Sequence, residues 1–281
     1  MKFLTKKDIL LRRRDSASHK GDNGRVLVIG GSLDYVGAVL LAGVASLRAG
    51  ADQVVIAAPE KVALTVNSFA PDIITKKFAG DCFAEKDADE VIAMSGSFDA
   101  VLMGNGIGLQ EGTQKFAARI CEGIEGPKVI DADAIKVISL KKIKNAIMTP
   151  HQKELQLLLE NSGLHDIGQE ENFEKKMKRL KEFAGSNVFL IKGKYDAIVS
   201  KDKMSYNKTG NEGMTKGGTG DVLAGITAAM LAQEKDALKA ACAAAYISGE
   251  IGDILKKEKG YGFLASDMIN KIPEVMKRHW R

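Results

Sequence analysis

Residues 215–221 are the part of this sequence whose residue types and spacing point most clearly to chemistry. They read Thr-Lys-Gly-Gly-Thr-Gly-Asp, and a helix is predicted directly after them because apolar residues fall on one helical face. Those residues are Val222, Leu223, Ile226, Ala229 and Met230. A glycine-rich turn ahead of a helix presents unpaired backbone N–H groups and the positive end of the helix dipole to one point. The stretch therefore predicts a site for an anion, in the first place a phosphate.

Asp221, in the first turn of that helix, has two interpretations. It can be a helix-capping carboxylate in a glycine-rich loop, which requires no ligand. Beside a bound phosphate it would be a costly neighbour unless it performs chemistry or holds a metal. The lysine precedes the glycines instead of following them, so the run is not a Walker loop. The second interpretation is a phosphoryl-transfer site, in which N–H groups stabilise the transferred group and the aspartate takes a proton from a hydroxyl.

A second glycine cluster, Gly104-Asn105-Gly106-Ile107-Gly108, follows a predicted strand. A dinucleotide-binding fingerprint, with Asp131 as a ribose ligand, is one interpretation and would make the protein a hydride-transfer enzyme. The spacing is G-x-G-x-G and not G-x-G-x-x-G, which argues against it. The other interpretation is that these glycines let the backbone approach a bulky substrate.

Two further polar segments also begin where predicted strands end. Lys192, followed by Gly193, can contact a nucleotide phosphate and allow an adenosine to approach, but the segment can equally be a charged hairpin turn. Residues 149–155 predict a helix start in which Thr149 and Glu154 form a capping box. His151 is not needed for that cap and is available to hydrogen-bond a ligand.

The elements that must position these residues alternate between short apolar runs and helical patterns. Strands are predicted at 26–29, 54–57, 101–103, 129–130, 146–148 and 188–191, with a possible pairing of 197–199 and 204–206. Helices are predicted at 36–48, within the polar segment 168–185, at 237–257 and at 267–278. Repeated strand–helix units predict an α/β fold with a mostly parallel sheet, whose carboxyl edge collects the polar residues.

Composition excludes several classes of protein. The net charge of +5 is mild and dispersed, which argues against a nucleic-acid partner, and no apolar run is long enough for a membrane span. The cysteines, Cys82, Cys121 and Cys242, are unpaired in sequence, as expected of inert thiols in a reducing cytoplasm, and the histidines form no metal cluster. An N-terminal amphipathic helix is predicted from Phe3, Leu4, Ile9, Leu10 and Leu11. The sequon at Asn207 has no other sign of secretion beside it.

Taken in order, these motifs resemble the NAD(P)H-hydrate dehydratase family of the ribokinase-like superfamily. The matching segments are residues 19–21, 24–26, 29–32, 37–38, 131–134, 149–151, 192–193, 209–211 and 217–221. They span about residues 16 to 278. The resemblance implies a ribokinase-like three-layer α/β/α fold with a mostly parallel central sheet, formed as one domain by residues 1–281. It also implies that no epimerase domain is fused in front, since the chain begins too close to the dehydratase motifs.

Such enzymes repair hydrated NADH and NADPH, and are carbon–oxygen lyases. The resemblance implies that a nucleotide phosphoryl group is transferred to the hydroxyl of the (6S)-hydrate, so that phosphate leaves and the ring double bond reforms. ADP is the expected donor, giving AMP and phosphate, with ATP as the alternative and Mg²⁺ bridging the phosphates. A cytoplasmic homotetramer is implied, with the small-molecule hydrate and an adenine nucleotide as its partners and with neither nucleic acid nor membrane.

The family's site residues can be placed on this sequence. Asp221 would be the catalytic base and would also touch the hydrate, and Gly218, Thr219 and Gly220 would form the anion hole. The hydrate pocket would be lined by Ala38, Gly106 and His151. The adenine nucleotide would be bound by Lys192, Gly193, Lys194, Tyr195, Asp196 and Gly220. No protein residue is implied as a metal ligand.

Two segments depart from the family pattern. Many relatives have Gly-Pro-Gly at residues 104–106, and many have Pro-Gly-Glu directly after the histidine. Both differences change loop stiffness.

Two rival functions remain: a vitamin-precursor kinase using the same Asp221 and glycine loop, and a non-catalytic adenine-nucleotide sensor. The sensor gains nothing from a carboxylate beside phosphate, and the kinase does not account for residues 19–21 and 149–151.

Overall fold

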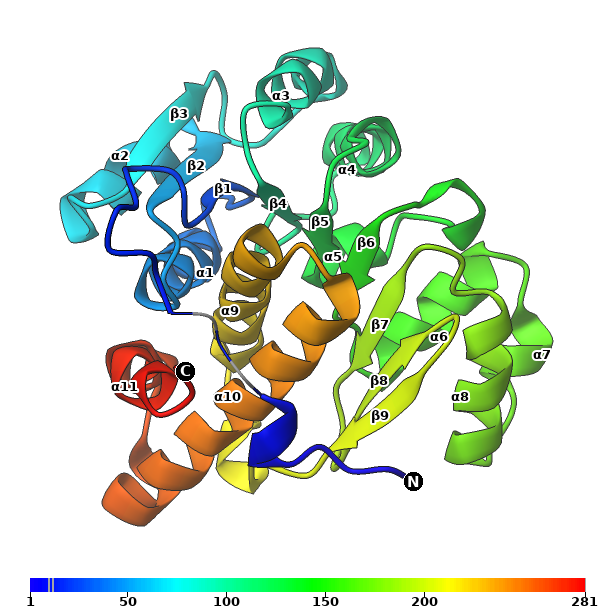
Figure 1. Cartoon of the computed structure of the whole chain (residues 1–281). Coiled ribbons are helices and arrows are strands. Elements are labelled where there is room, and N and C mark those ends of the chain that lie inside the picture. Colours follow the sequence, from blue (N-terminus) through cyan, green and yellow to red (C-terminus); the bar gives the residue numbers. More distant parts are fainter. Residues whose placement is uncertain (10, 12, 281) are drawn as a thin grey trace.

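A sheet of nine strands forms the centre of the computed structural model, which describes residues 1–9, 11 and 13–280 (Figure 1). The strand order is β3-β2-β1-β4-β5-β6-β7-β8-β9. The strands are β1 (Arg25–Ile29), β2 (Gln53–Pro59), β3 (Ile74–Phe78), β4 (Ala100–Met103), β5 (Lys128–Ile130), β6 (Ala146–Met148), β7 (Val188–Ile191), β8 (Asp196–Ser200) and β9 (Met204–Asn207). Neighbours from β3 to β7 are parallel, whereas β7, β8 and β9 are antiparallel.

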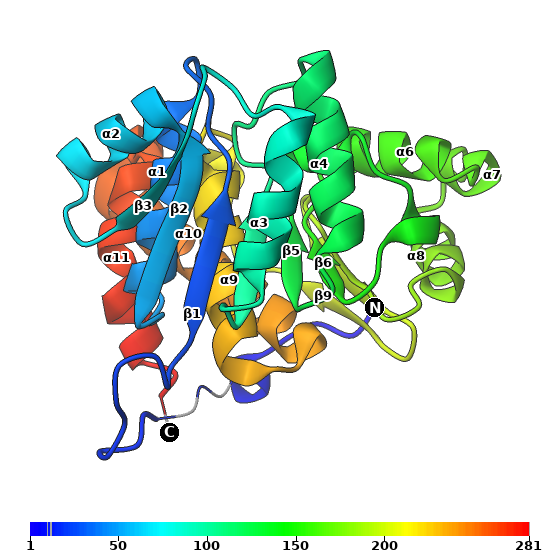
Figure 2. The ribbon, with the colours of Figure 1, turned by 90° about the horizontal axis from the view of Figure 1, so that it is seen from above.

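Helices cover both faces of the sheet, so the predicted three-layer α/β/α architecture is confirmed (Figures 1 and 2). One face is covered by α1 (Val36–Arg48), α2 (Glu60–Phe69), α9 (Thr219–Glu234), α10 (Ala237–Lys259) and α11 (Ala265–Lys277). The other is covered by α3 (Ala88–Ser95), α4 (Glu111–Gly123), α5 (Ala132–Ile135), α6 (Gln152–Asn161), α7 (His165–Gly168) and α8 (Phe173–Glu182). Short 3₁₀ turns occupy Lys6–Asp8, Glu85–Asp87, Leu140–Lys142, Glu212–Met214 and Gly260–Gly262.

The predicted strands are present because their apolar side chains are buried on both faces of a parallel sheet. Val26 of β1, for example, pairs with Val54 of β2 on one side and Ala100 of β4 on the other, and all three are essentially unexposed. Strand β3 is not predicted from the sequence, because its exposed Lys76 and Lys77 break the apolar pattern. Charged residues of this kind are typical of a strand at a sheet edge.

Helix α9 differs from its prediction. The sequence analysis placed its apolar residues on one face, but the helix is buried on every side from Val222 to Ala232. It packs between α1 and α10 and against the sheet (Figure 1). Gly225 allows the close approach to α1, since a Cβ there would lie 2.2 Å from the carbonyl oxygen of Ala42.

The predicted N-terminal amphipathic helix is wrong. Only Lys6–Asp8 form a 3₁₀ turn, while Phe3 and Leu11 make isolated β-bridges to Tyr206 and Trp280. Leu4, Ile9 and Leu11 are buried against the body of the protein; Leu10 lies outside the described residues. Backbone pairing with β9 therefore overrides the helical spacing of these side chains.

Three further expectations from the sequence concern membrane-spanning helices, the cysteines and the sequon at Asn207. None of the described helices is both long enough and apolar enough to cross a membrane. The three cysteines are free, with Cys121 and Cys242 buried and Cys82 half-buried. Burial raises the pKa of the Cys121 thiol to about 12 and that of Cys242 to about 11, so both are inert, as expected. Asn207 is fully buried, which places its sequon out of reach of glycosylation.

Close packing of α1 against α9 gives a first prediction. Gly225→Ala should lower the free energy of unfolding by about 3 kcal/mol, because its methyl group has no room between the two helices. Gly112→Ala, in α4, is the matched control: nothing lies within 4 Å of its added Cβ, and removing a glycine from a helix should stabilise by up to about 1 kcal/mol. Urea unfolding measures both, and equal effects would contradict the close-packing account.

Candidate active site

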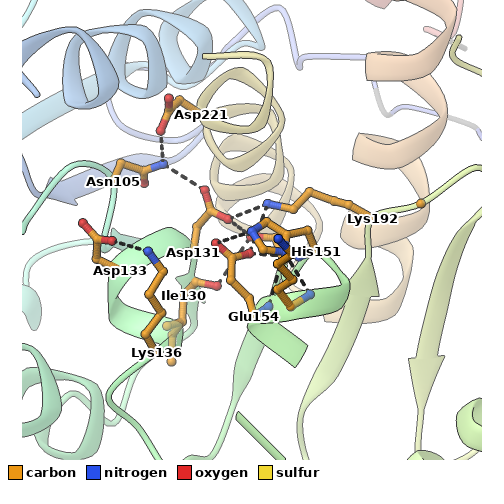
Figure 3. A network of polar contacts seen from close by, with 12 residues as sticks. Asn105, Ile130, Asp131, Asp133, Lys136, His151, Glu154, Lys192 and Asp221 are labelled. Atoms are coloured by element: carbon orange, nitrogen blue, oxygen red, sulfur yellow. Dashed lines mark hydrogen bonds and ion pairs between the residues drawn. The ribbon is translucent and has the colours of Figure 1, made fainter. Parts of the chain in front are cut away.

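The polar residues singled out in the sequence converge where β4 to β7 end and α9 begins (Figure 3). Asn105 follows β4, Asp131 follows β5, His151 follows β6 and Lys192 follows β7. Asp221 meets them from the first turn of α9. The prediction that the carboxyl edge of the sheet gathers these residues is therefore confirmed.

The glycine-rich turn forms the start of α9 as the sequence predicts. Gly218 is the N-cap residue with a φ of 90°, and a Cβ there would lie 2.7 Å from the Leu41 side chain, so only glycine fits. The Thr219 hydroxyl donates to the carbonyl oxygens of Met214 at 2.7 Å and Lys216 at 2.9 Å, which fixes the turn. Backbone N–H groups in the first turn of a helix have no intrahelical acceptor and are available to an anion.

Asp131 is the most highly coordinated group of the site. It is 2% exposed, and it accepts hydrogen bonds from the Thr149 hydroxyl at 2.6 Å, from Nδ2 of Asn105 at 3.0 Å and from Nζ of Lys192 at 3.1 Å. The next residue, Ala132, has a φ of 51°, a left-handed conformation that is strained for a residue with a Cβ. Because Asp131 is almost unexposed and is already held by three donors from within the protein, its surroundings argue against the interpretation of this residue as a ribose ligand.

Asp221 lies beside that group without an ion pair of its own among the described residues. Its Oδ1 accepts a 2.7 Å hydrogen bond from Nδ2 of Asn105. Burial raises the pKa of Asp221 to about 7, and the charge of Asp131 adds to the effect, while the Asn105 hydrogen bond and Lys192 oppose it. A carboxyl group that titrates near neutrality is suited to accept a proton from a hydroxyl. Asp221 is the third residue after the N-cap, Gly218, and does not itself cap the helix.

Lys192 balances the negative charges. Its Nζ lies 3.1 Å from Asp131 and 3.8 Å from Oε2 of Glu154. Burial disfavours its charged form, but the two carboxylates outweigh that effect and raise the pKa of Lys192, so it stays cationic. A Cβ on Gly220 would lie 3.6 Å from Nζ, which shows how closely this cation approaches the turn at the start of α9.

His151 is the N-cap of α6, a role that the sequence analysis gave to Thr149. Its side-chain Nδ1 accepts hydrogen bonds from the backbone N–H groups of Lys153 and Glu154. The backbone N–H of His151 donates to Oε2 of Glu154. Since Nδ1 accepts two hydrogen bonds, the ring proton sits on Nε2. The ring is about half exposed and its Nε2 lies 3.4 Å from Oε1 of Glu154, so a ligand would share the Nε2–H with that carboxylate while Nδ1 holds the helix.

A pocket of about 820 Å³ opens on one side of this centre. Its lining includes every residue expected to bind a nucleotide: Lys192, Gly193, Lys194, Tyr195, Asp196 and Gly220. Residues 193–195 are indeed the turn between β7 and β8, so the hairpin interpretation is correct as topology, but the turn also forms a pocket wall. Burial raises the pKa of Asp196 to about 6, against hydrogen bonds from Asn207 and Gly193.

The expected hydrate residues are not all brought together. His151 lines the same pocket as the nucleotide residues. Ala38 and Gly106 lie next to each other instead, since a Cβ on Gly106 would be 3.0 Å from that of Ala38. Gly106 adjoins Asn105, whose side-chain amide donates to Asp221. Residues 21 and 23 bind Asp52 ahead of β1 and form no part of this centre.

Sequence reasoning missed four of the groups that shape the site. Asn105 was considered only as part of a glycine loop, Thr149 and Glu154 only as caps, and Asp131 only as a ribose ligand. Of these four residues, Asn105, Asp131 and Thr149 lie within two positions after the last residue of a strand. That position, combined with a polar side chain in an otherwise apolar neighbourhood, is the signal that could have found them.

Comparison with known proteins decides the family. The family model for NAD(P)H-hydrate dehydratase matches residues 26–274. The chain belongs to the NAD(P)H-hydrate dehydratase family. Its ribokinase-like fold, shared with solved proteins of that superfamily, is thereby confirmed.

Two curated relatives and one solved structure illustrate the similarity of this dehydratase-family chain. It is 42% identical over 270 residues to the bifunctional NAD(P)H-hydrate repair enzyme Nnr of Methanocaldococcus jannaschii, covering 95% of this chain and 51% of that protein. It is 32% identical to the ADP-dependent (S)-NAD(P)H-hydrate dehydratase of Natrialba magadii, covering 91% and 93%. The ADP/ATP-dependent dehydratase of Bacillus subtilis, co-crystallised with ATP/Mg²⁺, superposes with a TM-score of 0.81 at 28% identity, covering 99% and 98%.

The chain spans about half the length of the bifunctional relatives it matches. The family-model match, residues 26–274, includes the glycine turn and Asp221. The family model and the named relatives agree on a dehydratase family, and the kinase alternative finds no such support.

The cap formed by His151 gives a second prediction. His151→Ala should lower the free energy of unfolding by about 1 kcal/mol, because two N–H groups of α6 lose their acceptor. His151→Asn should remain close to the wild type, since asparagine is a good N-cap. Thermal unfolding compares the two variants, and equal losses would show that His151 does not stabilise α6 through its cap.

The half-buried carboxylate of Asp221 gives a third prediction. Because its pKa is raised in the folded state, the folded protein binds the proton more tightly than the unfolded chain, and stability falls as pH rises from about 4 to about 7. Asp221→Asn should therefore raise the free energy of unfolding by about 2 kcal/mol near pH 8 and by less near pH 5.

A control of opposite sign is available at Asp52. Hydrogen bonds from Asn23 and Gly21, with the charge of Arg14, outweigh burial and lower the pKa of Asp52. Asp52→Asn should therefore destabilise near neutral pH, where the carboxylate is ionised. Urea unfolding at two pH values tests both variants. A gain for Asp221→Asn that is larger at the lower pH would rule out the buried charge as its cause.

Proposed function

We propose that this protein dehydrates the (6S)-hydrate of NADH and NADPH, using ADP as phosphoryl donor and releasing AMP and phosphate. The observation that carries the proposal is the position of Asp221: a half-buried carboxylate with a raised pKa, in the first turn of a helix that begins at a glycine-rich turn and whose first N–H groups have no intrahelical acceptor. A site that only bound a nucleotide would gain nothing from a carboxylate there. The named relatives act on this hydrate, and one of them is named as ADP-dependent.

In the first step the hydrate hydroxyl loses its proton to Asp221 and its oxygen bonds to the terminal phosphorus of ADP. The bond between that phosphorus and the bridging oxygen breaks, and AMP leaves with the electron pair. N–H groups of Gly218, Thr219 and Gly220 would stabilise the charge on the transferred group. Lys192, held cationic by Asp131 and Glu154, would contact the nucleotide phosphates beside that turn.

In the second step the ring carbon–oxygen bond breaks and inorganic phosphate leaves, which is easier than expelling hydroxide. The electron pair of the ring nitrogen drives this departure, and loss of a proton from the adjacent carbon restores the double bond. The net reaction removes one water from the hydrate, with that oxygen ending in phosphate. Ala38, Gly106 and the Nε2–H of His151 would hold the hydrate around Asp221.

Mg²⁺ fits this site as a companion of the nucleotide. No group of three acidic, histidine or cysteine side chains that could hold a metal occurs in the part of the chain that is described. Asp131 and Glu154 are already occupied by Lys192. Mg²⁺ commonly binds through substrate phosphates and water in place of a protein cage, and bound in that way it would neutralise phosphate charge.

Three finer points extend the proposal. We take residues 1–281 as one dehydratase domain, which agrees with a single sheet whose strands lie between Arg25 and Asn207 and on which the C-terminal helices pack. A cytoplasmic location and a homotetramer are expected from the resemblance to the family, and unpaired thiols are compatible with that location. Both hydrates are expected to be substrates, because they differ only at a phosphate remote from the reacting ring.

The fourth prediction tests the activity directly. Purified protein mixed with NADH hydrate, Mg²⁺ and either ADP or ATP should restore the near-ultraviolet absorbance of the reduced nicotinamide ring, and faster with ADP. Asp221→Asn should bind ADP as well as the wild type, measured by calorimetry, but lose turnover by about 10²-fold or more. Folded wild-type protein that is inactive on intact hydrate with both nucleotides would refute the proposal, and unchanged turnover in the variant would remove Asp221 as base.

A further inference from the structure

Asn105 is completely buried between two carboxylates and has no part in the steps above. Its Nδ2 donates to Oδ1 of Asp221 at 2.7 Å and to Oδ2 of Asp131 at 3.0 Å (Figure 3). A side-chain amide nitrogen carries two protons, and both are used here. Ionised carboxylates can only accept hydrogen bonds, so the nitrogen end of the amide must face them.

The backbone around Asn105 is clamped, which gives its side chain a fixed direction. Its carbonyl oxygen accepts from the N–H of Gly31 at 2.9 Å, and a Cβ on Gly30 would lie 2.4 Å from that same oxygen. On the other side, Gly104 has a φ of 113°, and a Cβ there would lie 2.0 Å from the carbonyl oxygen of Asp131. Neither glycine can be replaced without moving this segment, so the backbone that carries Asn105 is fixed, and the two hydrogen bonds and complete burial hold its amide against the carboxylates.

The remaining atom of the amide shows that packing alone does not explain this residue. Oδ1 of Asn105 is buried and has no hydrogen-bond partner among the described residues. Burying an unpaired polar group is unfavourable, and an apolar side chain would avoid it. The two hydrogen bonds to the carboxylates are therefore the reason for an asparagine at this position.

We propose that Asn105 is a positioning residue for Asp221: its amide holds that carboxylate in the ionised, proton-accepting state and ties it to the buried pair of Asp131 and Lys192. The inference rests on the proposed function in one respect, that Asp221 is the base. Asn105 touches neither reacting group, and acts only through Asp221.

The charges around Asp221 set the direction in which its pKa moves when the Asn105 amide is removed. Burial raises its pKa most, and the charges of Asp131 and Asp133 raise it further, whereas the Asn105 hydrogen bond and Lys192 lower it. Asp133 is itself paired with Lys136, and Lys192 lies within 3.8 Å of Glu154. Removing the amide takes away a stabilising contact of the ionised form only, so the pKa of Asp221 must rise. Because the base works when ionised, activity would then be lost at a higher pH as the solution is acidified.

The test compares Asn105→Ala with Thr149→Val. The Thr149 hydroxyl donates to Asp131 at 2.6 Å, so this control removes a buried hydrogen bond from the same cluster and leaves the charge of Asp131 and the amide contact with Asp221 in place. Infrared difference spectra of the ligand-free proteins follow the carbonyl stretch of protonated Asp221, assigned by its absence in Asp221→Asn. We expect the midpoint to rise by about one pH unit in Asn105→Ala and to stay unchanged in Thr149→Val.

The acid limb of kcat/KM for NADH hydrate should move by the same amount in Asn105→Ala, with activity partly recovered at alkaline pH. An unmoved midpoint in Asn105→Ala, or an equal shift in Thr149→Val, would overturn the inference and leave Asn105 a merely structural residue. If Asn105→Ala does not fold, Asn105→Ser is measured instead, since its shorter side chain cannot span both carboxylates. A wild-type protein without turnover would remove the proposed function, while the infrared titration would still decide the role of Asn105.

Discussion

The buried carboxylate of Asp131 is the interaction on which the geometry of this site depends. It draws Asn105, Thr149 and Lys192 to one point from three loops that follow neighbouring strands. A buried charge is tolerated only while its partners stay in place, so these strand ends cannot drift apart without a large loss of stability. Through Asn105 the same carboxylate also reaches Asp221, which links the sheet to α9.

The site combines this well-compensated charge with a poorly compensated one. Asp131 has three donors, one of which is the cation Lys192, whereas Asp221 has a single donor and lies beside another carboxylate. The difference in their surroundings leaves Asp131 as a fixed anion and places Asp221 near its titration point at neutral pH. The unfavourable electrostatic energy of the site is concentrated at Asp221. Helix α9, which is buried on all sides directly after this residue, holds Asp221 rigidly in place.

Much of the fold was predictable because its elements carry strong local patterns. The helix at 36–48 and the strand at 188–191 were predicted with the bounds that α1 and β7 have, since continuous apolar runs and flanking glycines define both. Edge strand β3 was not predicted because its lysines interrupt the apolar pattern. The N-terminal segment was wrongly predicted as a helix, because its residues form β-bridges to Tyr206 and Trp280. Local spacing fails where long-range pairing decides the conformation.

For the site, the sequence by itself determined the glycine turn ahead of a helix, the aspartate in its first turn, and the order of motifs that identifies the family, because all of these are contained in short segments. Only the tertiary structure decided that Asn105 joins Asp131 to Asp221, that His151 caps α6, and that Ala38 and Gly106 lie apart from the nucleotide pocket. The physical reason is that hydrogen bonds and desolvation act between residues up to 116 positions apart in the chain. The pKa of an aspartate depends on those neighbours and not on the residues beside it in sequence.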